Sequence, residues 1–391
     1  MHGNTSIEDR SLPLAGCRVV ERSSTVAAAY AGRLLATLGA DVAMLEPQGG
    51  SPLREAPPDL GNGGGSALFA YLSSGKHSLV HAPDDTTDNV LAIALAGADI
   101  FIDDTPIAER EAMGVDEASI AGRFPSLIHV SVLPFGASGP KSTWRGEEIN
   151  LVHASGEGFL LPNGLSNELF PDRAPLKIYG HFAGYQAGCV AALSALSAWW
   201  AKPDHGGQYV DVSVQDAMLL CGAFALQRLG DGSLEHRASR SFRYGGVFQA
   251  RDGYIELLTL EERQWKGLAQ LLGHPEWTRD KSLDDSLERS RRGAEINRHI
   301  REWMATRDVD SIVRSAQELG VPAAKYRTPE EVVHGVHEQS RGLFAPLLLQ
   351  NGQPSTVLVA PYCFHRTPLQ QSGKVPALDK SGQSMPQESR C

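Results

Sequence analysis

Phe182-Ala-Gly-Tyr-Gln-Ala-Gly-Cys-Val-Ala-Ala-Leu-Ser-Ala-Leu-Ser-Ala-Trp-Trp200 contains the longest apolar run of the chain. An apolar entry, Ala174-Pro-Leu-Lys-Ile-Tyr-Gly180, leads through small residues into this segment, which predicts a long apolar helix. The N–H groups at a helix N-terminus lack partners, so this junction suits a carboxylate nucleophile or a developing oxyanion. The run is interrupted by serines and is too short to span a bilayer.

The 391 residues are too many for one simple core and indicate two domains or one elaborated domain. An apolar fraction of 42% is typical of a globular, enzyme-like protein. The formal charge of −10 argues against nucleic acid as a general partner, because no broad basic surface is supplied. A local basic pocket for a phosphorylated ligand remains compatible with this charge.

The cysteine pattern and the N-terminus indicate a cytoplasmic protein. The five cysteines are far apart, odd in number and without a CxxC pair, which favours reduced thiols. Residues 1–10 lack a basic segment followed by an apolar one, so no secretory signal is predicted. We therefore expect a soluble protein that does not contact membranes.

Strands and helices alternate through the first third of the chain. This alternation predicts a largely parallel sheet with helices on both faces, an α/β fold of the Rossmann-like, doubly wound type. The expected strands are Arg18–Glu21, Asp41–Glu46, His77–Val80, Ala98–Ile102 and Ser126–Val132, and the expected helices include Ala27–Leu38 and Asp88–Ala96.

The texture of the sequence changes after a polar stretch at 230–243, which indicates a second, smaller α+β domain. A strand and a helix are expected after Gly206, and a hairpin around Arg251-Asp-Gly253 is followed by three helical patterns. The predicted divisions are a large domain at 14–205, a linker at 206–239, a small domain at 240–325, a return to the large domain at 326–369 and a loosely ordered tail at 370–391.

Several well-known site motifs are missing from the sequence. The turn Glu21-Arg-Ser-Ser-Thr-Val-Ala27 carries neither GxGxxG nor a Walker lysine, and GxSxG does not occur. His334, His337 and Glu338 have loosely helical metal spacing, but no third separated ligand is evident. We therefore predict no metal site and no dinucleotide site of the Rossmann type.

Nine short stretches occur together in one order, and they resemble the family III CoA-transferases, which include formyl-CoA and carnitine CoA-transferases and α-methylacyl-CoA racemases. The likeness covers about residues 14 to 345. The stretches are Leu14-Ala-Gly-Cys-Arg-Val-Val-Glu21, Ala36-Thr-Leu-Gly-Ala-Asp-Val-Ala-Met-Leu-Glu-Pro47, Gly49-Gly-Ser-Pro-Leu-Arg54, Gly75-Lys-His-Ser78, Ala98-Asp-Ile-Phe-Ile-Asp-Asp104, Gly136-Ala-Ser-Gly-Pro140, Gly207-Gln-Tyr-Val-Asp-Val212, Arg251-Asp-Gly-Tyr254 and Gly320-Val-Pro-Ala323.

The resemblance implies an interlocked, ring-like dimer in which each chain forms a large Rossmann-like domain and a small domain. It also implies coenzyme A or acyl-CoA as substrate and no metal or redox cofactor. In the family, an Asp at the start of one helix forms mixed-anhydride and thioester intermediates with the enzyme. Thioester exchange needs such a carboxylate, a water-poor pocket and N–H donors for the oxyanion.

This chain lacks that Asp. Aligning Phe182-Ala-Gly-Tyr-Gln-Ala-Gly188 on the family motif puts Gly184 at the Asp position, and a register shifted by one helical turn puts His181 there. Neither register supplies a carboxylate. Loss of an essential nucleophile lowers rates by about 10⁴–10⁶. The structural alternative is that Gly184 and its small neighbours form a face for close helix packing. A further alternative is that the missing side chain leaves room for a bulkier ligand.

The remaining candidate catalytic residues lie at or near the two motifs. Glu147 stands where the racemases carry a His, so ordinary racemisation is not expected. Glu148 falls where several transferases carry an active-site acid and is a candidate general acid or base, with a solvated helix-start carboxylate as the alternative. His181 could be a base and Tyr185 could point a hydroxyl into the pocket, although a structural His and a packed aromatic are the commoner outcomes.

The resemblance also implies contacts to coenzyme A. Leu72, Lys76 and Arg145 match family positions that line the adenine and phosphate sites, and the two cations would contact phosphates. Asp104 and Thr105 stand where the family often has a cation or an Asn-Phe pair. An acid there would repel a polyanion, and the alternative for the cations is an ordinary surface role.

Three functions follow as hypotheses. The first is a non-nucleophilic subunit of a heteromeric CoA-transferase whose homologous partner brings the Asp, with a homodimer as the alternative assembly. The second is a repurposed isomerase, hydratase or lyase that uses Glu147, Glu148 or His181, and the third is a binding or scaffold protein. A carboxylate from elsewhere in this chain at the start of the long helix would overturn the first hypothesis.

Overall fold

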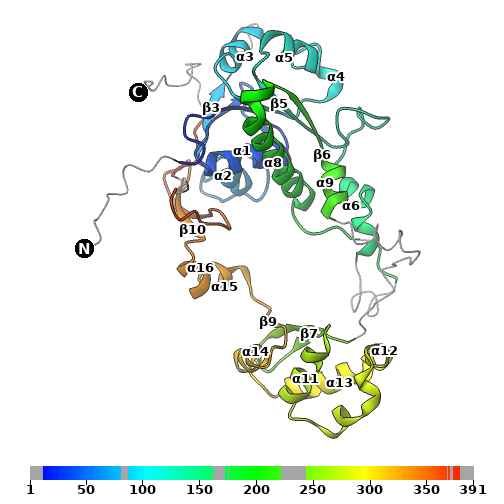
Figure 1. Cartoon of the computed structure of the whole chain (residues 1–391). Coiled ribbons are helices and arrows are strands. Elements are labelled where there is room, and N and C mark those ends of the chain that lie inside the picture. The colour runs from blue at the N-terminus through cyan, green and yellow to red at the C-terminus, as the bar shows by residue number, and fades with distance from the viewer. Residues whose placement is uncertain are drawn as a thin grey trace. The chain divides into compact units, whose positions relative to one another are not determined.

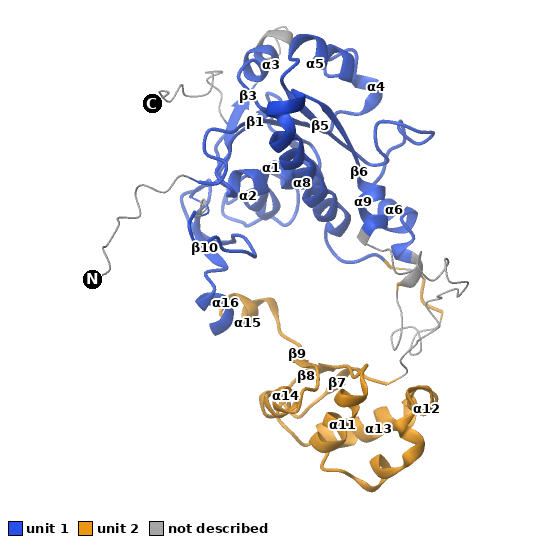
Figure 2. Cartoon of the chain, viewed as in Figure 1, with its two compact units in different colours: residues 1–158, 177–231, 336–391 blue, residues 159–176, 232–335 orange. Residues whose placement is uncertain are grey.

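The computed structural model describes residues 12–80, 87–161, 172–174, 176–221, 244–367, 369 and 373–378. The chain divides into two compact units (Figure 2). The first comprises Met1–Gly158, Lys177–Asp231 and Val336–Cys391, and the second comprises Phe159–Leu176 and Gly232–Gly335. The chain thus passes from the first unit to the second twice, and the predicted small domain at 240–325 falls inside the second unit.

A six-stranded parallel sheet forms the centre of the first unit (Figure 1). Its strands lie in the order β3-β2-β1-β4-β5-β6. The bounds are β1 Arg18–Arg22, β2 Asp41–Glu46, β3 His77–Val80, β4 Ile100–Asp103, β5 Ile128–Leu133 and β6 Tyr209–Ser213. The predicted parallel sheet is confirmed, and β6 lies in the range that the sequence analysis assigned to a linker.

Helices cover both faces of this sheet (Figure 1). Side chains alternate along a strand, and accordingly Val19 and Ile102 belong to the buried cluster that includes residues of α1 and α8, whereas Val20 and Phe101 belong to the cluster that includes residues of α3 and α5. The helices described in the first unit, not all of which lie on the sheet, are α1 Val26–Thr37, α2 Ala67–Ser73, α3 Thr87–Leu95, α4 Ile107–Arg110, α5 Glu117–Arg123, α6 Glu148–Ala154, α8 Phe182–His205, α9 Val214–Cys221 and α16 Val336–Ser340. The doubly wound arrangement expected from the sequence is therefore present.

Close packing of α1 against α8 depends on small residues. Gly184 and Gly188 face α1, and a Cβ added to Gly188 would lie 2.8 Å from the carbonyl oxygen of Ala27. Ala183, Ala187 and Ala191 are buried in the same core. The packing face predicted as the structural role of these residues is confirmed, because only small side chains allow the two backbones to approach so closely.

The second unit holds a three-stranded antiparallel sheet covered by helices. The hairpin expected around Arg251–Gly253 joins β7 to β8, with the N–H of Ala250 bonded to the carbonyl of Gly253 at 2.8 Å. The elements are β7 Gly246–Gln249, β8 Tyr254–Leu257, α11 Glu262–Leu271, α12 Ser286–Arg291, α13 Gly293–Met304, α14 Val309–Glu318, β9 Ala323–Lys325 and α15 Pro329–Val333.

The hairpin β10 Phe344–Leu348 and β11 Pro354–Leu358 belongs to the first unit. Val375 is buried in the same apolar cluster as residues of this hairpin, and Lys374 forms a bridge with Leu348. The predicted loose tail is therefore wrong for 373–378, because an apolar side chain docks there. The polar stretch 230–243 lies outside the described residues. None of the helices within the described ranges is long and apolar enough to cross a membrane.

Candidate functional site

The strand order places a topological switch point between β1 and β4. The helix that follows β1 packs on one face of the sheet, whereas α5, after β4, packs on the other. Ligands of open α/β sheets bind in the crevice at such a point, beyond the carboxyl ends of the strands. Here that crevice is bordered by the turn 23–25 after β1 and by Asp103, Asp104 and Thr105 at the end of β4.

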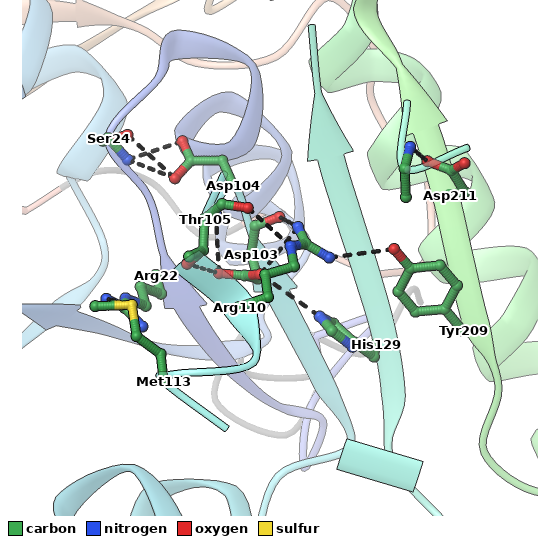
Figure 3. Close-up of polar contacts among 11 residues, drawn as sticks. Arg22, Ser24, Asp103, Asp104, Thr105, Arg110, Met113, His129, Tyr209 and Asp211 are labelled. Atoms are coloured by element: carbon green, nitrogen blue, oxygen red, sulfur yellow. Dashed lines mark hydrogen bonds and ion pairs between the residues drawn. The ribbon is translucent and has the colours of Figure 1, made fainter. Parts of the chain in front are cut away.

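Asp104 occupies the N-terminus of α1 (Figure 3). Its carboxylate accepts hydrogen bonds from the backbone N–H of Ser24 at 2.8 Å, from the N–H of Thr25 at 2.7 Å and from the Ser24 hydroxyl at 3.2 Å. The group is 7% exposed. Burial and the nearby charge of Asp103 raise the pKa of Asp104 to about 6, against the opposing effect of these hydrogen bonds.

Asp103 belongs to a separate buried network beside β5 and β6 (Figure 3). Its carboxylate lies 3.0 Å from a guanidinium nitrogen of Arg110 and 3.7 Å from a ring nitrogen of His129, and it accepts from the Thr105 hydroxyl at 2.5 Å. Burial acts to raise the pKa of Asp103, but His129 and the Arg110 charge hold it below its usual value. Arg110 also donates to the Tyr209 hydroxyl at 3.1 Å.

Neither of these roles was predicted from the sequence. There Asp104 is interpreted only as an acid that would repel a polyanion, and Asp103-Asp104 only as the end of a family motif. The available signal was an acidic pair at the end of a buried strand, since carboxylates are rarely buried unless a partner is present. The partner of Asp104 is a helix N-terminus 80 residues away, and a pairing over that distance cannot be predicted from the neighbouring residues in the sequence.

Glu148, the first residue of α6, extends its carboxylate to the N-terminus of α8. One oxygen accepts from the N–H of Ala183 at 2.7 Å, and the other accepts from the N–H of Gly184 at 3.3 Å. The side chain is half-buried. The helix start that the sequence analysis expected to lack a carboxylate therefore holds one from elsewhere in the same chain, which corrects that expectation.

Gly184 itself serves packing. It is the third residue of α8, and a Cβ added there would lie 3.1 Å from the Cβ of Val26 on α1. The geometry thus gives no support to Gly184 as the seat of a side-chain nucleophile. His181, the alternative register, is the exposed residue immediately before α8 and makes no side-chain hydrogen bond to the start of the helix.

The starts of α1 and α8 lie against each other. The Cβ position on Gly184 is 3.6 Å from the backbone nitrogen of Ala27, the second residue of α1. Two helix N-termini, each holding a carboxylate from a distant part of the chain, therefore adjoin in the first unit. Partial positive charge from both helices stabilises anions in this region.

The other residues predicted near this site are dispersed. Glu147 is the exposed residue that precedes α6, and its N–H donates to the side chain of Asn150 at 3.1 Å. Arg145 is exposed two residues earlier. Tyr185 packs against Tyr30 with ring centroids 4.8 Å apart, and burial raises the pKa of Tyr185 to about 12. Of the described side chains in the predicted catalytic set, that of Glu148 is the one that accepts hydrogen bonds from the start of α8.

Lys76 and Leu72 are buried in the first unit. The Lys76 ammonium is fully buried, pairs with Glu21 at 2.6 Å and donates to the carbonyl of Ala29 at 2.7 Å. Burial lowers the pKa of Lys76, and the Glu21 charge opposes that effect. Because its donors serve internal partners, the geometry does not support the expected contact of Lys76 with a phosphate.

One pocket borders these two residues. Its cavity volume is about 10 Å³, it lies beside the carboxyl ends of β1 and β2, and its walls include Glu21, Glu46, Leu72 and Lys76. A cavity of this size holds about one water molecule at most. The pocket therefore has no room for an adenine nucleotide. Among the residues that the structure describes, no group of three His, Cys, Asp or Glu side chains is arranged to hold a metal ion.

The first unit is an open, doubly wound α/β fold whose switch point adjoins two helix starts, each of which holds a carboxylate. The chain belongs to CoA-transferase family III, whose sequence profile matches residues 14–382. The resemblance drawn from the motifs is thereby confirmed.

Individual relatives agree with this assignment. The chain is 32% identical over 320 residues to a probable CoA-transferase of Mycobacterium tuberculosis, a match that covers 79% of this chain and 39% of that longer protein. It is 26% identical to a succinyl-CoA:mesaconate CoA-transferase of Haloarcula hispanica over 93% of each chain. A crystal structure of a CaiB/BaiF family protein from Brucella suis superimposes with a TM-score of 0.83 at 24% identity, covering 95% of this chain and 98% of that one. The last comparison supports the fold.

Proposed function

We propose that this chain transfers coenzyme A between carboxylic acids and that Glu148 is the reacting carboxylate. The observation that carries the proposal is the placement of the Glu148 carboxylate on the N–H groups of Ala183 and Gly184. A helix N-terminus stabilises the ionised form that attacks a thioester. Each carboxylate oxygen keeps a further lone pair after accepting one hydrogen bond, so attack remains open.

The proposed reaction proceeds by acyl exchange at Glu148. A carboxylate oxygen attacks the thioester carbonyl and expels the CoA thiolate, which leaves a mixed anhydride on the enzyme. The thiolate then attacks the glutamyl carbonyl, releases the first acid and forms a glutamyl thioester. The second acid repeats the two steps in reverse order, and the N–H groups of Ala183 and Gly184 lie beside the carbon where the oxyanion forms.

The names of the relatives suggest the substrates to be tried. The matched proteins include a succinyl-CoA:mesaconate CoA-transferase, a succinate–glutarate CoA-transferase of Agrobacterium fabrum and an L-carnitine CoA-transferase of Proteus mirabilis. We propose small carboxylic acids of this kind as acceptors and their CoA thioesters as donors. We further propose the interlocked dimer of two large and two small domains as the working assembly.

The Glu148 carboxylate at the start of α8 counts against the first hypothesis of the sequence analysis, a non-nucleophilic subunit of a heteromeric CoA-transferase, and that hypothesis stands as a second candidate only if Glu148 does not react. One matched relative is the alpha subunit of a succinyl-CoA–L-malate CoA-transferase of Chloroflexus aurantiacus, and His181 precedes α8 in this chain. In that case a homologous partner would bring the reacting Asp. Glu148 would then only cap α8.

One experiment separates the two candidates. The purified chain is incubated with succinyl-CoA and each acceptor acid, and new CoA esters are followed by mass spectrometry. Digestion should reveal the peptide that carries Glu148 heavier by coenzyme A less one water. The adduct should vanish in Glu148→Gln and persist in Glu147→Gln, the matched control. Exchange that persists in Glu148→Gln overturns the first candidate, and exchange that requires an added homologous subunit establishes the second.

A further inference from the structure

We infer that Asp104 is a built-in anion that closes the start of α1 to phosphate groups and so restricts which part of a ligand can enter the switch-point crevice. Asp104 lies outside the proposed reaction at Glu148. Its role at α1 does not depend on which acid is transferred or on whether the chain acts alone.

The start of α1 has the properties of an anion site. It follows β1 at the switch point, which is where open α/β proteins place a ligand phosphate on backbone N–H groups. The donors present are the N–H groups of Ser24 and Thr25 and the Ser24 hydroxyl, all within 2.7–3.2 Å of one carboxylate. These are the donors that a phosphate would use, and Asp104 already holds them.

The strand backbone fixes Asp104 in this position. Its own N–H donates to the carbonyl of Arg22 at 3.3 Å, which ties the end of β4 to the end of β1. A tethered carboxylate competes with a free anion at a high effective concentration. Displacing it would also leave a carboxylate buried without partners beside Asp103, which is strongly unfavourable.

Ser24 and Thr25 are exposed, so the turn after β1 is open to solvent, and Asp104, not the packing around the turn, keeps a phosphate from these donors. Val26 and Ala27, which follow them, lie against Gly184 of α8. Because the N–H groups of Ser24 and Thr25 are bonded to Asp104, the phosphates of a CoA ligand must bind elsewhere on this protein, while an uncharged or short acyl portion meets no such barrier.

The test uses inorganic phosphate as the probe and the whole chain, labelled with ¹⁵N in serine and threonine. In the wild type the amide signals of Ser24 and Thr25 should not move as phosphate is added to millimolar concentration. In Asp104→Ser, which removes the anion and opens space, both should shift saturably, with affinity at least about tenfold higher. Asp99→Asn removes the same charge at the opposite end of the β4 segment and should behave like the wild type.

Two results would overturn the inference. One is a set of saturable phosphate shifts at Ser24 and Thr25 in the wild type, and the other is a folded Asp104→Ser protein that gains no affinity. Asp104→Asn, which keeps the shape of the side chain, replaces Asp104→Ser if that protein fails to fold, and it should also gain affinity. If neither variant folds, the wild-type titration alone decides between an open and a closed helix start. CoA-transfer assays play no part here, so this result is independent of the proposed reaction.

Discussion

The starts of α1 and α8 are both capped by a carboxylate, but the two carboxylates differ in exposure. Each receives a carboxylate from a distant part of the chain, Asp104 at α1 and Glu148 at α8, and each carboxylate accepts two backbone N–H bonds. Asp104 is 7% exposed and accepts a further bond from the Ser24 hydroxyl, whereas Glu148 is half-buried and has only the backbone donors among its described contacts.

The difference in burial separates a structural anion from a reactive one. A fully enclosed carboxylate cannot reach a substrate, so Asp104 can only hold the turn and exclude other anions. A carboxylate with solvent access and the same helix-derived stabilisation can attack a carbonyl. The two carboxylates accept the same number of backbone N–H bonds, and exposure assigns the role.

The largest effect on CoA transfer should come from removing the Glu148 carboxylate, and removing the Asp104 carboxylate provides the comparison. Glu148→Gln should lower kcat/KM for CoA transfer by about 10⁴, because the reacting group is lost. Asp104→Asn should change it by less than about tenfold, because that group touches no substrate. The measurement is the initial rate of thioester exchange at matched fold content, and Glu147→Gln is the control. Equal losses of kcat/KM in Glu148→Gln and Asp104→Asn would show that the two carboxylates do not differ in their role in catalysis.

The second effect is the contribution of Asp104 to the pH dependence of stability. Its carboxyl has a pKa raised by burial to about 6 in the folded chain, above its ordinary value of 3.8, so the folded state holds the proton more tightly. The contribution of Asp104 to stability should therefore fall as pH rises from about 4 to 6 and then level off, with a total loss on the order of 3 kcal/mol.

Asp104→Asn isolates this contribution. The difference in unfolding free energy between wild type and variant, measured by urea denaturation, should change between pH 4 and 7 and stay flat above pH 7. Groups common to both proteins cancel in that difference. A difference that is flat across the whole range would show that Asp104 does not ionise at an elevated pKa.

Much of the fold was predictable because its signals are local. The strands Asp41–Glu46 and His77–Val80 have the predicted bounds, since short apolar runs between turn residues are typical of buried parallel strands. The packing role of the small residues in Phe182–Gly188 was also open to prediction. In each case the decisive pattern lies within a few consecutive residues.

The site was less predictable because its contacts are distant in sequence. Glu148 was identified as a candidate acid, but its placement on α8 joins residues 35 and 36 positions apart. The burial of Lys76 against Glu21 spans 55 positions, and it turns a predicted ligand contact into an internal ion pair. Residue type and family position named the candidates, and tertiary packing decided which of them are accessible.

The third effect tests whether the two helix starts must adjoin. Gly188→Ala would bring a Cβ to within 2.8 Å of the Ala27 carbonyl oxygen and should destabilise the fold by about 1–3 kcal/mol by overpacking. Gly122→Ala on α5 is the matched control, because nothing lies within 4 Å of its Cβ position and helix propensity should improve stability by up to ~1 kcal/mol. Thermal denaturation measures both. Unchanged stability in Gly188→Ala would mean that the helices can separate freely.

The smallest effect concerns the hydroxyl that distinguishes the α1 site from the α8 site. Ser24→Ala removes the 3.2 Å hydrogen bond to Asp104 and should lower the free energy of unfolding by about 1 kcal/mol at pH 8, where the carboxylate is charged. The same change in an Asp104→Asn background should cost less, because hydrogen bonds to charged groups are the stronger ones. A double-mutant cycle by urea denaturation reads the difference directly. A coupling of zero would show that the hydroxyl adds nothing to the backbone donors, which would leave exposure as the single feature that separates Asp104 from Glu148.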